Sequence, residues 1–536
     1  MSVNPFNPKC PKLPWMVDFY TSDDGKVYDT QLQAAFANTT LDYLSCLNIK
    51  SKPAKFKETQ LVCSISANTS CNTIEEMLQQ GMSVAKIVGT SQAKILETMS
   101  KIHAVTNNYS RKLGRVYPLA IALEIKGPEI RTGILKGPEN KIYLEKGKIT
   151  NITTNPSYEE HVTEDMIYVD YENFPAIVHP GDKVLLDNGS VTLSALECVE
   201  SIIRCIVERA GQLLSNASVI VQDAPIEMPM VSASDKELLK LSIHEHVDYL
   251  FLSGIYSKEG ILEVKDLLGE EGKSILIFPK IDSLVSIENV NKILEISDGI
   301  CLDCDRLMVE LPKEKVFLVQ KSILAKCNLA GKPCVCTIKI SDLRSISKSE
   351  VCDIANAVLD GADALLIPPE ACIKDLVKSI VVICKEAEPA VYQKQIFNEL
   401  SNSITSPMEA LYALAMSAVE SALKTNAAAV ICLTSSGRTA KLLSRFKPRC
   451  PIIAITRYIG VAKQLCIFRG VEPILYLKSF GGNWDKDVAE RVQLGVTYGK
   501  YIGYIRMGDA VVTVTGSRPE CGMPNNIQDF RILNET

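Results

Sequence analysis

Short apolar segments alternate with amphipathic ones from about residue 58 onward, and this alternation constrains the fold more than any other feature. Eight apolar segments are strand candidates: LVCSIS, MSVAKIV, LAIALEI, YLFLSGI, SILIFPKI, GICLDC, CVCTIK and ALLIPPE. Several are almost continuously apolar, as expected of strands covered by helices outside and packed inside a barrel. Helical patterns such as TIEEMLQQ, IENVNKILEI and KSEVCDIANAVLDG lie between them. Eight such units predict a (β/α)8 TIM barrel.

The spacing of the units predicts two further domains. About a hundred residues separate LAIALEI from YLFLSGI, and they hold short β-like pieces punctuated by Gly, Asn and Pro, which predicts an inserted small β-barrel lid domain. A new α/β pattern after residue 390 predicts a C-terminal open sheet with covering helices. We therefore expect an N-terminal arm (1–57), a barrel in two parts (58–126 and 225–389), the lid (127–224) and a C-terminal α/β domain (390–536).

Composition narrows the class of protein. With 536 residues, 46% of them apolar, the chain can bury a large core and form about three domains. Its net charge of -5 comes without long runs of one sign, which argues against a nucleic-acid or lipid surface. We find no signal peptide and no membrane-spanning run, so we expect a cytoplasmic protein. Most of the 18 cysteines lie in apolar runs, which indicates buried, reduced thiols.

One cysteine pair has metal-like spacing. Cys301 and Cys304 fall within the predicted strand GICLDC, where an offset of three places side chains on opposite faces. This geometry argues against a zinc site there.

Charged residues gather where the predicted barrel strands end. In a barrel the carboxyl ends of the strands meet at one mouth, so these side chains should converge. Ten charged residues lie at these strand ends, just past them or in the turn EIKGPEIRTG. They are Lys86, Glu124, Lys126, Glu129, Arg131, Lys280, Asp282, Asp303, Asp305 and Arg306. Several basic groups around a few carboxylates suit an anionic, phosphorylated ligand. The alternative is a set of structural ion pairs at the rim.

A second candidate site is LTSSGRTAKLL in the C-terminal part, where a strand passes into a helix. Amides at the helix start, the hydroxyls of Thr434, Ser436 and Thr439, the turn at Gly437 and the Arg438 guanidinium could hold a phosphate. Helix capping alone would also explain these hydroxyls.

Several motifs together carry a family resemblance. The segments LEIKGPEIRTG, IFPKID, NLAGKP, DIANAVLDGAD, LTSSGRTA and RPECGMPN occur in the order found in pyruvate kinases, so the chain resembles that family over about residues 58–530. The resemblance implies transfer of the phosphoryl group of phosphoenolpyruvate to ADP, giving ATP, with Mg²⁺ and K⁺ as cofactors. It also implies a homotetramer, or a hetero-oligomer with an active relative.

The resemblance assigns roles to the residues at the barrel mouth. Lys280 matches the lysine at the transferring phosphoryl group, and Lys126, Glu129 and Arg131 match the charged turn under the phosphates and nucleotide. Lys86 stands where the family has an arginine, which keeps the charge but loses the two-pronged geometry.

The metal positions depart from the family pattern. The potassium ligands correspond to Val88, Thr90, Glu124 and Ile125, with valine in place of asparagine and Glu124 in place of aspartate. The first magnesium carboxylate is Asp282.

The second magnesium carboxylate falls on Arg306. A guanidinium offers no lone pair and repels Mg²⁺, so the expected alternative is that Asp305 or Asp303 takes the ligand position.

The same resemblance assigns an effector pocket to the C-terminal part. Its residues would be the cradle at 434–439 with Trp484, Arg491 and Gly516, and its ligand fructose 1,6-bisphosphate; Ser435 stands where responsive members often have lysine.

Three functional hypotheses follow from these matches and departures. The first is a pyruvate-kinase-like protein with little or no catalysis that binds an anion or an assembly partner. The others are a working pyruvate kinase with rearranged metal sites and a pure scaffold.

Overall fold

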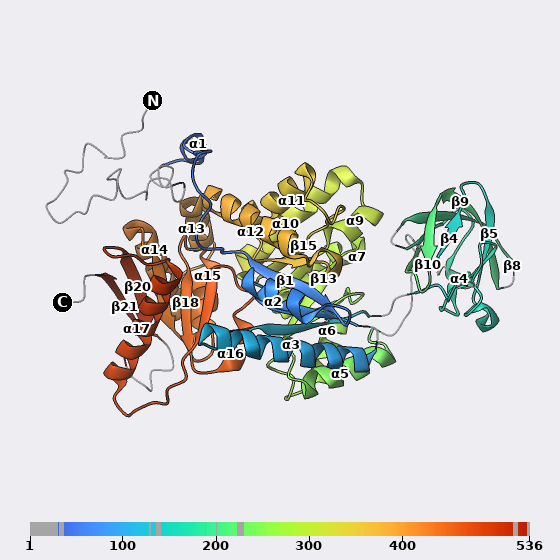
Figure 1. Cartoon of the computed structure of the whole chain (residues 1–536). Coiled ribbons are helices and arrows are strands. Elements are labelled where there is room, and N and C mark those ends of the chain that lie inside the picture. The colour runs from blue at the N-terminus through green and yellow to red at the C-terminus, as the bar shows by residue number, and fades with distance from the viewer. Residues whose placement is uncertain are drawn as a thin grey trace.

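A computed structural model describes residues 31, 37–89, 91–127, 130–135, 141–187, 189–199, 201–221, 230–517 and 524–532. Figure 1 shows a central barrel with a C-terminal domain on one side and an inserted β domain on the other. Eight parallel strands close the barrel in the order β1-β16-β15-β14-β13-β12-β3-β2. These strands are β1 Gln60–Ser66, β2 Val84–Val88, β3 Ala120–Ile125, β12 Tyr249–Leu252, β13 Leu276–Ile281, β14 Ile300–Leu302, β15 Cys334–Thr337 and β16 Ala364–Ile367. The predicted (β/α)8 barrel is confirmed.

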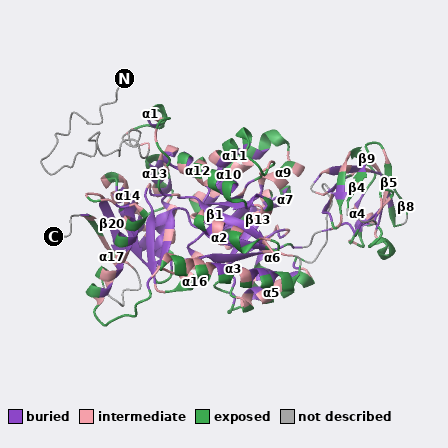
Figure 2. Ribbon diagram, viewed as in Figure 1, coloured by how far each residue is buried: buried purple, intermediate pink, exposed green. Residues whose placement is uncertain are grey.

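Helices surround the barrel, and their outer faces are exposed while the strands are buried (Figure 2). They are α2 Cys71–Gln79, α3 Gln92–Leu113, α5 Ala233–His244, α6 Lys258–Leu268, α7 Leu284–Glu288, α8 Val290–Ile296, α9 Cys304–Glu310, α10 Val316–Ala330, α11 Lys348–Leu359 and α12 Lys374–Ala387. Short 3-10 turns are η4 Pro156–Tyr158, η5 Lys313–Lys315, η6 Pro369–Ala371 and η7 Glu388–Ala390. The segment IENVNKILEI is divided between two helices, because Asn289 ends α7 before α8 begins.

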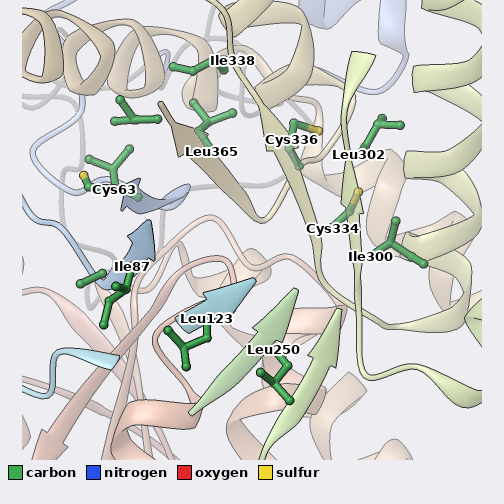
Figure 3. Packing of buried hydrophobic residues seen from close by; sticks show 14 of the residues in the cluster. Cys63, Ile87, Leu123, Leu250, Ile300, Leu302, Cys334, Cys336, Ile338 and Leu365 are labelled. Carbon is green, nitrogen blue, oxygen red and sulfur yellow. The ribbon is translucent and has the colours of Figure 1, made fainter. Parts of the chain in front are cut away.

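Alternation along the strands divides the apolar core into two sets. One set packs between strands and helices, and Figure 3 shows part of it, with Cys63, Ile87, Leu123, Leu250 and Leu365. The residues between them on the strands form a second buried cluster, which continues into the C-terminal domain. Its barrel members are Val62, Val84, Ala120, Ala122, Tyr249, Phe251, Phe278, Cys301, Val335, Ala364 and Leu366. Because side chains alternate with a period of two, the residues two positions further along face the same interior.

The inserted domain lies between β3 and α5 in the chain and has its own core. It holds a six-stranded curled sheet in the order β11-β7-β8-β9-β5-β6 and a two-stranded sheet β10-β4. Its elements are β4 Lys141–Leu144, β5 Ile149–Thr153, β6 Met166–Tyr168, α4 Phe174–Ile177, β7 Lys183–Leu186, β8 Val191–Val199, β9 Ile202–Arg209, β10 Gly211–Leu214 and β11 Val219–Val221. The turn between β7 and β8 touches the barrel, because a Cβ added at the buried Gly189 would lie 3.0 Å from Val309 Cγ1 on α9.

The C-terminal domain is the predicted α/β open sheet, with strand order β19-β18-β17-β20-β21. Only β21 runs antiparallel to its neighbour. The elements are α13 Gln393–Asn402, α14 Ala410–Thr425, β17 Ala429–Leu433, α15 Arg438–Arg445, β18 Ile452–Thr456, α16 Ile459–Gln464, β19 Val471–Leu475, α17 Trp484–Ile502, β20 Ala510–Thr515 and β21 Asn526–Arg531.

A buried arginine joins the C-terminal domain to the barrel. Arg469, 4% exposed, donates from Nε to the Glu58 carboxylate at 3.0 Å, and its NH2 lies 2.9 Å from the same oxygen. Its NH1 donates to the carbonyls of Val358 and Ala362, each at 3.3 Å. This one side chain therefore holds the start of β1 and the end of α11 against the sheet.

The described part of the N-terminal arm contains one short helix, α1 Thr40–Ser45. The expectation that Cys304 lies on a strand is wrong: β14 stops at Leu302, and Asp303 caps α9 by accepting a hydrogen bond from the Arg306 amide. Among the described residues, no helix is both long and apolar enough to cross a membrane.

Candidate functional site

The charged residues at the carboxyl end of the barrel continue the inward faces of its strands. Lys86 follows Val84, Glu124 follows Ala122, Ser253 follows Phe251 and Lys280 follows Phe278, each by two positions. The strand register supports the arrangement, because Lys86 pairs with Ala122 and Phe251 with Glu124. The barrel is thus filled by apolar side chains below and closed by a charged layer at its mouth.

Glu124 is the centre of this layer. Its Oε2 lies 2.5 Å from Lys86 Nζ, its Oε1 lies 3.6 Å from Lys280 Nζ, and Ser253 Oγ donates to Oε1 at 2.7 Å. Burial raises the pKa of Glu124, but Lys86 and Lys280 outweigh burial and hold it well below its ordinary value. Glu124 is therefore a carboxylate with two ammonium partners.

Lys280 is held between two carboxylates. Besides Glu124, it lies 2.9 Å from Asp303 Oδ2. Burial lowers the pKa of Lys280, yet Glu124 and Asp303 more than reverse this and raise it above its ordinary value. Lys280 is consequently a fixed cation at the barrel mouth, suited to bind an anion but not to exchange a proton near neutral pH.

Arg306 and Asp282 form the second part of the site. Asp282 is fully buried, and its Oδ2 lies 3.6 Å from Arg306 Nε. Burial raises the pKa of Asp282 to about 6, against the opposing effects of Arg306 and Lys280. Tyr256 lies in the same buried region, and burial followed by the Asp282 charge raises the pKa of its hydroxyl. Neither Asp282 oxygen accepts a hydrogen bond of ordinary geometry, so Arg306 provides its main charge compensation.

The donor set of this region does not fit a magnesium ion. Unsatisfied oxygens on Asp282 would suit a cation, but Mg²⁺ needs several oxygen ligands in near-octahedral geometry. Within the described residues, no three His, Cys, Asp or Glu side chains are grouped to hold a metal. The Arg306 guanidinium stands beside the fully buried Asp282 carboxylate, where it would repel a divalent ion by several kcal/mol at an effective dielectric constant of about 20.

The two alternative magnesium ligands are engaged elsewhere. Asp303 caps α9 and pairs with Lys280. Asp305 Oδ1 lies 3.8 Å from Lys339 Nζ, towards the exposed rim. Both carboxylates therefore already have cationic partners, although Asp303 is close enough for its charge to raise the pKa of Asp282.

The turn after β3 carries the remaining predicted residues. Gly127 has a φ of +69°, and a Cβ there would lie 2.4 Å from the Ser253 carbonyl oxygen, so the close approach of these two chain segments requires glycine. Lys126 is exposed. Arg131 donates from NH1 to the Asn216 carbonyl at 2.8 Å, which attaches it to the inserted domain.

Two residues to which the resemblance assigned a role, Thr90 and Glu129, lie outside the described residues. Ser253 was not identified from the sequence, although its position two residues after Phe251 could have indicated that it faces the mouth.

The second candidate site lies at the carboxyl edge of the C-terminal sheet. β17 and β20 are parallel neighbours, so Thr434 and Gly516 follow adjacent strand ends. Thr434 Oγ1 accepts a hydrogen bond from the Gly437 amide at 2.9 Å; Ser436 and Arg438 are exposed and Thr439 is buried.

The aromatic part of this site is built around α17. Trp484 Nε1 donates to the Gly516 carbonyl at 2.9 Å, and Arg491 lies under the Trp484 ring, 5.3 Å from its centroid. Arg491 is buried and its NH2 lies 2.6 Å from Asp487 Oδ2. Arg438 pairs with Glu409 at 2.5 Å. Both arginines therefore already have carboxylate partners that a phosphate would have to displace.

Comparisons with known proteins cover most of the chain. The family described as "Pyruvate kinase, barrel domain" matches residues 56–375, and "Pyruvate kinase, alpha/beta domain" matches residues 412–528. Pyruvate kinase PKLR of Rattus norvegicus is 36% identical over 507 residues, covering 92% of this chain and 88% of the relative. Pyruvate kinase 1 of Trypanosoma brucei brucei is 33% identical, with 89% and 97% covered. The pyruvate kinase of Candida albicans is 30% identical, with 92% and 99% covered.

Proposed function

Since the chain belongs to the pyruvate kinase family, we propose that it binds a small anion at the barrel mouth but has lost most metal-assisted phosphoryl transfer. The single observation that carries this proposal is the pairing of Arg306 with the fully buried Asp282. Phosphoryl transfer depends on positioning and on metal ions that neutralise the phosphate oxygens. A guanidinium at one magnesium position opposes that function.

Two other substitutions at the site are expected to reduce turnover. Lys86 replaces an arginine of the family and is engaged with Glu124. Ile338 replaces the threonine near the enolate and is 7% exposed. Loss of one contact that stabilises transition-state charge can cost about 10³-fold in kcat, although such losses do not add.

A coupled assay tests the proposal directly. Phosphoenolpyruvate, ADP, Mg²⁺ and K⁺ are supplied, pyruvate is measured, and the Trypanosoma brucei pyruvate kinase 1 serves as positive control. We expect a kcat far below about 1 s⁻¹, whereas a kcat above this value would lie in the ordinary enzyme range and contradict the proposal. The variant with Arg306→Asp, Asp282→Glu and Lys86→Arg should gain turnover if the substituted positions are responsible.

A working pyruvate kinase with rearranged metal sites is the second candidate. It is favoured by Lys280, whose side chain is 14% exposed and held in place by Glu124 and Asp303. Under this alternative, either Asp305 or Asp303 would complete a magnesium site, Glu124 and Thr90 would hold K⁺, and the assay would show turnover that EDTA abolishes.

An assembly role is part of the proposal. Phe317, Leu318 and Leu329 on α10 are each more than half exposed, which suits burial against another subunit. We propose a homotetramer, or a hetero-oligomer with an active relative. Light scattering after size exclusion should give four subunits; a single subunit would favour the hetero-oligomer, and co-expression with an active pyruvate kinase tests that outcome.

A further inference from the structure

A cavity of about 210 Å³ lies where the N-terminal arm, the end of the barrel and the C-terminal domain meet. Its described walls come from segments within 54–58, 388–393, 426–428, 449–451 and 503–510. Glu58 on this wall precedes the first barrel strand, β1, by two residues. The cavity therefore lies on the amino-terminal side of the barrel, away from the charged mouth at the carboxyl ends of the strands.

Much of the cavity wall is apolar and close-packed. Phe56 and Tyr504 meet edge to face, with ring centroids 5.2 Å apart and ring planes at 72°. Phe56, Ala427 and Cys450 are each no more than 9% exposed. An apolar cavity of about 150 Å³ can take up benzene, so this cavity has room for one aromatic ring. Such a ring would pack against Phe56 at the separation of roughly 4.5–7 Å that aromatic pairs prefer.

Gln393 gives this apolar cavity an acceptor that the protein does not use. Gln393 begins α13, lines the cavity and is 5% exposed, and its Nε2 donates to the Glu388 carbonyl at 3.4 Å. Its Oε1 accepts no hydrogen bond from any residue that the structure describes. Unlike the Asp282 oxygens, this atom is not fully enclosed by protein. A ligand that presents an O–H or N–H group can therefore donate to it.

The charges around the cavity favour a neutral ligand. The six charged wall residues are Lys55, Arg449, Arg506, Glu58, Glu388 and Asp509, and with all six ionised their charges sum to zero. The two oxygens of Glu388 accept from the backbone amides of Glu58 at 2.9 Å and Thr59 at 2.7 Å. The Glu58 carboxylate is bound by Arg469. Neither of these buried carboxylates therefore requires a cationic ligand.

We propose that this cavity binds a small neutral aromatic molecule with one O–H or N–H donor, such as a phenol, and that the donor bonds to Gln393 Oε1. The inference does not depend on the proposed function, because the cavity and the barrel mouth lie at opposite ends of the strands. The walls come from three parts of the chain, so a bound ring would add contacts to all three. Binding should therefore stabilise the folded protein increasingly with ligand concentration.

Titration of the full-length protein with phenol and with toluene tests the inference. Toluene has the same ring but no donor, and both titrations are followed by the NMR signals of the ligand and by the melting temperature. We expect saturable phenol binding that raises the melting temperature. Benzoate and benzylamine should bind more weakly than phenol, because a charge taken into this balanced cavity has no partner of its own.

The variant Gln393→Leu isolates the hydrogen bond. The ratio of phenol to toluene affinity should fall by about tenfold, because the phenol hydroxyl then stays buried without an acceptor. The difference in hydration between the two ligands cancels, since it is the same for both proteins. Gln395→Leu is the matched control: Gln395 lies on the same helix, is exposed and donates to Glu399 at 2.7 Å. It should leave the ratio unchanged.

The variant Ala427→Leu tests the location, because a larger side chain at this wall position would occupy the space of the ring. Phenol binding should be lost while circular dichroism shows a folded protein, and Ala427→Val serves the same purpose if leucine is not tolerated. Unchanged phenol binding by the folded variant would overturn the location.

The remaining outcomes are equally decisive. No saturable binding of phenol to the natural protein would overturn the inference. An equal ratio of phenol to toluene affinity in the natural protein and Gln393→Leu would overturn the role of Gln393. Tighter binding of benzoate or benzylamine than of phenol would overturn the neutral class of ligand. Arg306→Asp should bind phenol like the natural protein, so failure here leaves the proposed anion site untouched.

Discussion

Replacement of Arg469 by methionine should weaken the junction between the barrel and the C-terminal domain more than any exposed contact does. The substitution keeps much of the side-chain volume but removes the partner of the buried Glu58 carboxylate, which is 6% exposed. It also removes the donor to the Val358 and Ala362 carbonyls. Removing one partner of a buried ion pair costs about 3–5 kcal/mol, because the other charge stays buried. We therefore expect a loss of ~4 kcal/mol in the free energy of unfolding.

Arg445→Met is the matched control. Arg445 also extends from the C-terminal domain to the barrel, where its NH2 donates to the Leu329 carbonyl at 2.6 Å, but this contact is exposed. No buried charge is left behind, so the expected cost is about 1 kcal/mol. Urea unfolding is followed by circular dichroism and by fluorescence, and the energies are compared where the two probes give one coincident transition.

A double-mutant cycle with Glu58→Gln identifies the cause. If the penalty of Arg469→Met comes from the stranded carboxylate, the double variant should be more stable than the sum of the single effects predicts, by at least ~2 kcal/mol. Additivity within about 0.5 kcal/mol, or a loss for Arg469→Met no larger than for Arg445→Met, would refute the reasoning.

Three shorter predictions concern single residues. Arg306→Asp should bind Mn²⁺, used as a probe for Mg²⁺, at least ~10-fold more tightly than the natural protein, because a carboxylate replaces a repelling charge; equal affinities by calorimetry would contradict the metal assignment. Burial lowers the pKa of Lys447 to about 8, so the folded state gains stability as pH rises from about 8 towards 10.5, while Lys447→Met lacks this gain. The difference in melting temperature, Lys447→Met minus the natural protein, should therefore decrease as the pH is raised from about 7 to about 9. A difference that stays constant over this range would argue against the lowered pKa. Fructose 1,6-bisphosphate should bind the C-terminal domain weakly, and Ser435→Lys should tighten it about tenfold by adding a cation; no thermal shift with either protein would remove the effector site.

The barrel could be predicted because each of its strands and helices has a recognisable pattern within its own short segment of the sequence. Each apolar run and each amphipathic segment can be recognised by its own period, and the eight runs correspond to the eight strands. The exception at Cys304 is also local: Asp303 is a strong helix N-cap, and its capping bond to the Arg306 amide ends the extended conformation earlier than the apolar pattern suggested.

The pairing of charges at the mouth was not predictable from the sequence. Strand ends showed that Lys86, Glu124 and Lys280 should converge, but barrel closure and strand register decide which ammonium meets which carboxylate. Arg469 gave no signal at all, because its partners lie more than a hundred residues away in the chain. Sequence patterns indicate which face a residue occupies, whereas the partner across that face depends on the complete tertiary structure.

The contact of Gly189 with Val309 gives the inserted domain a mechanical connection to the cation at the barrel mouth. Val309 and Arg306 are three residues apart on α9, so their side chains are neighbours on one side of the helix. Any swing of the inserted domain that lifts the Gly189 turn frees the surface one helical turn from the guanidinium. Because the contact lies one helical turn from Arg306, we expect undocking of the inserted domain to change the orientation of Arg306 towards Asp282.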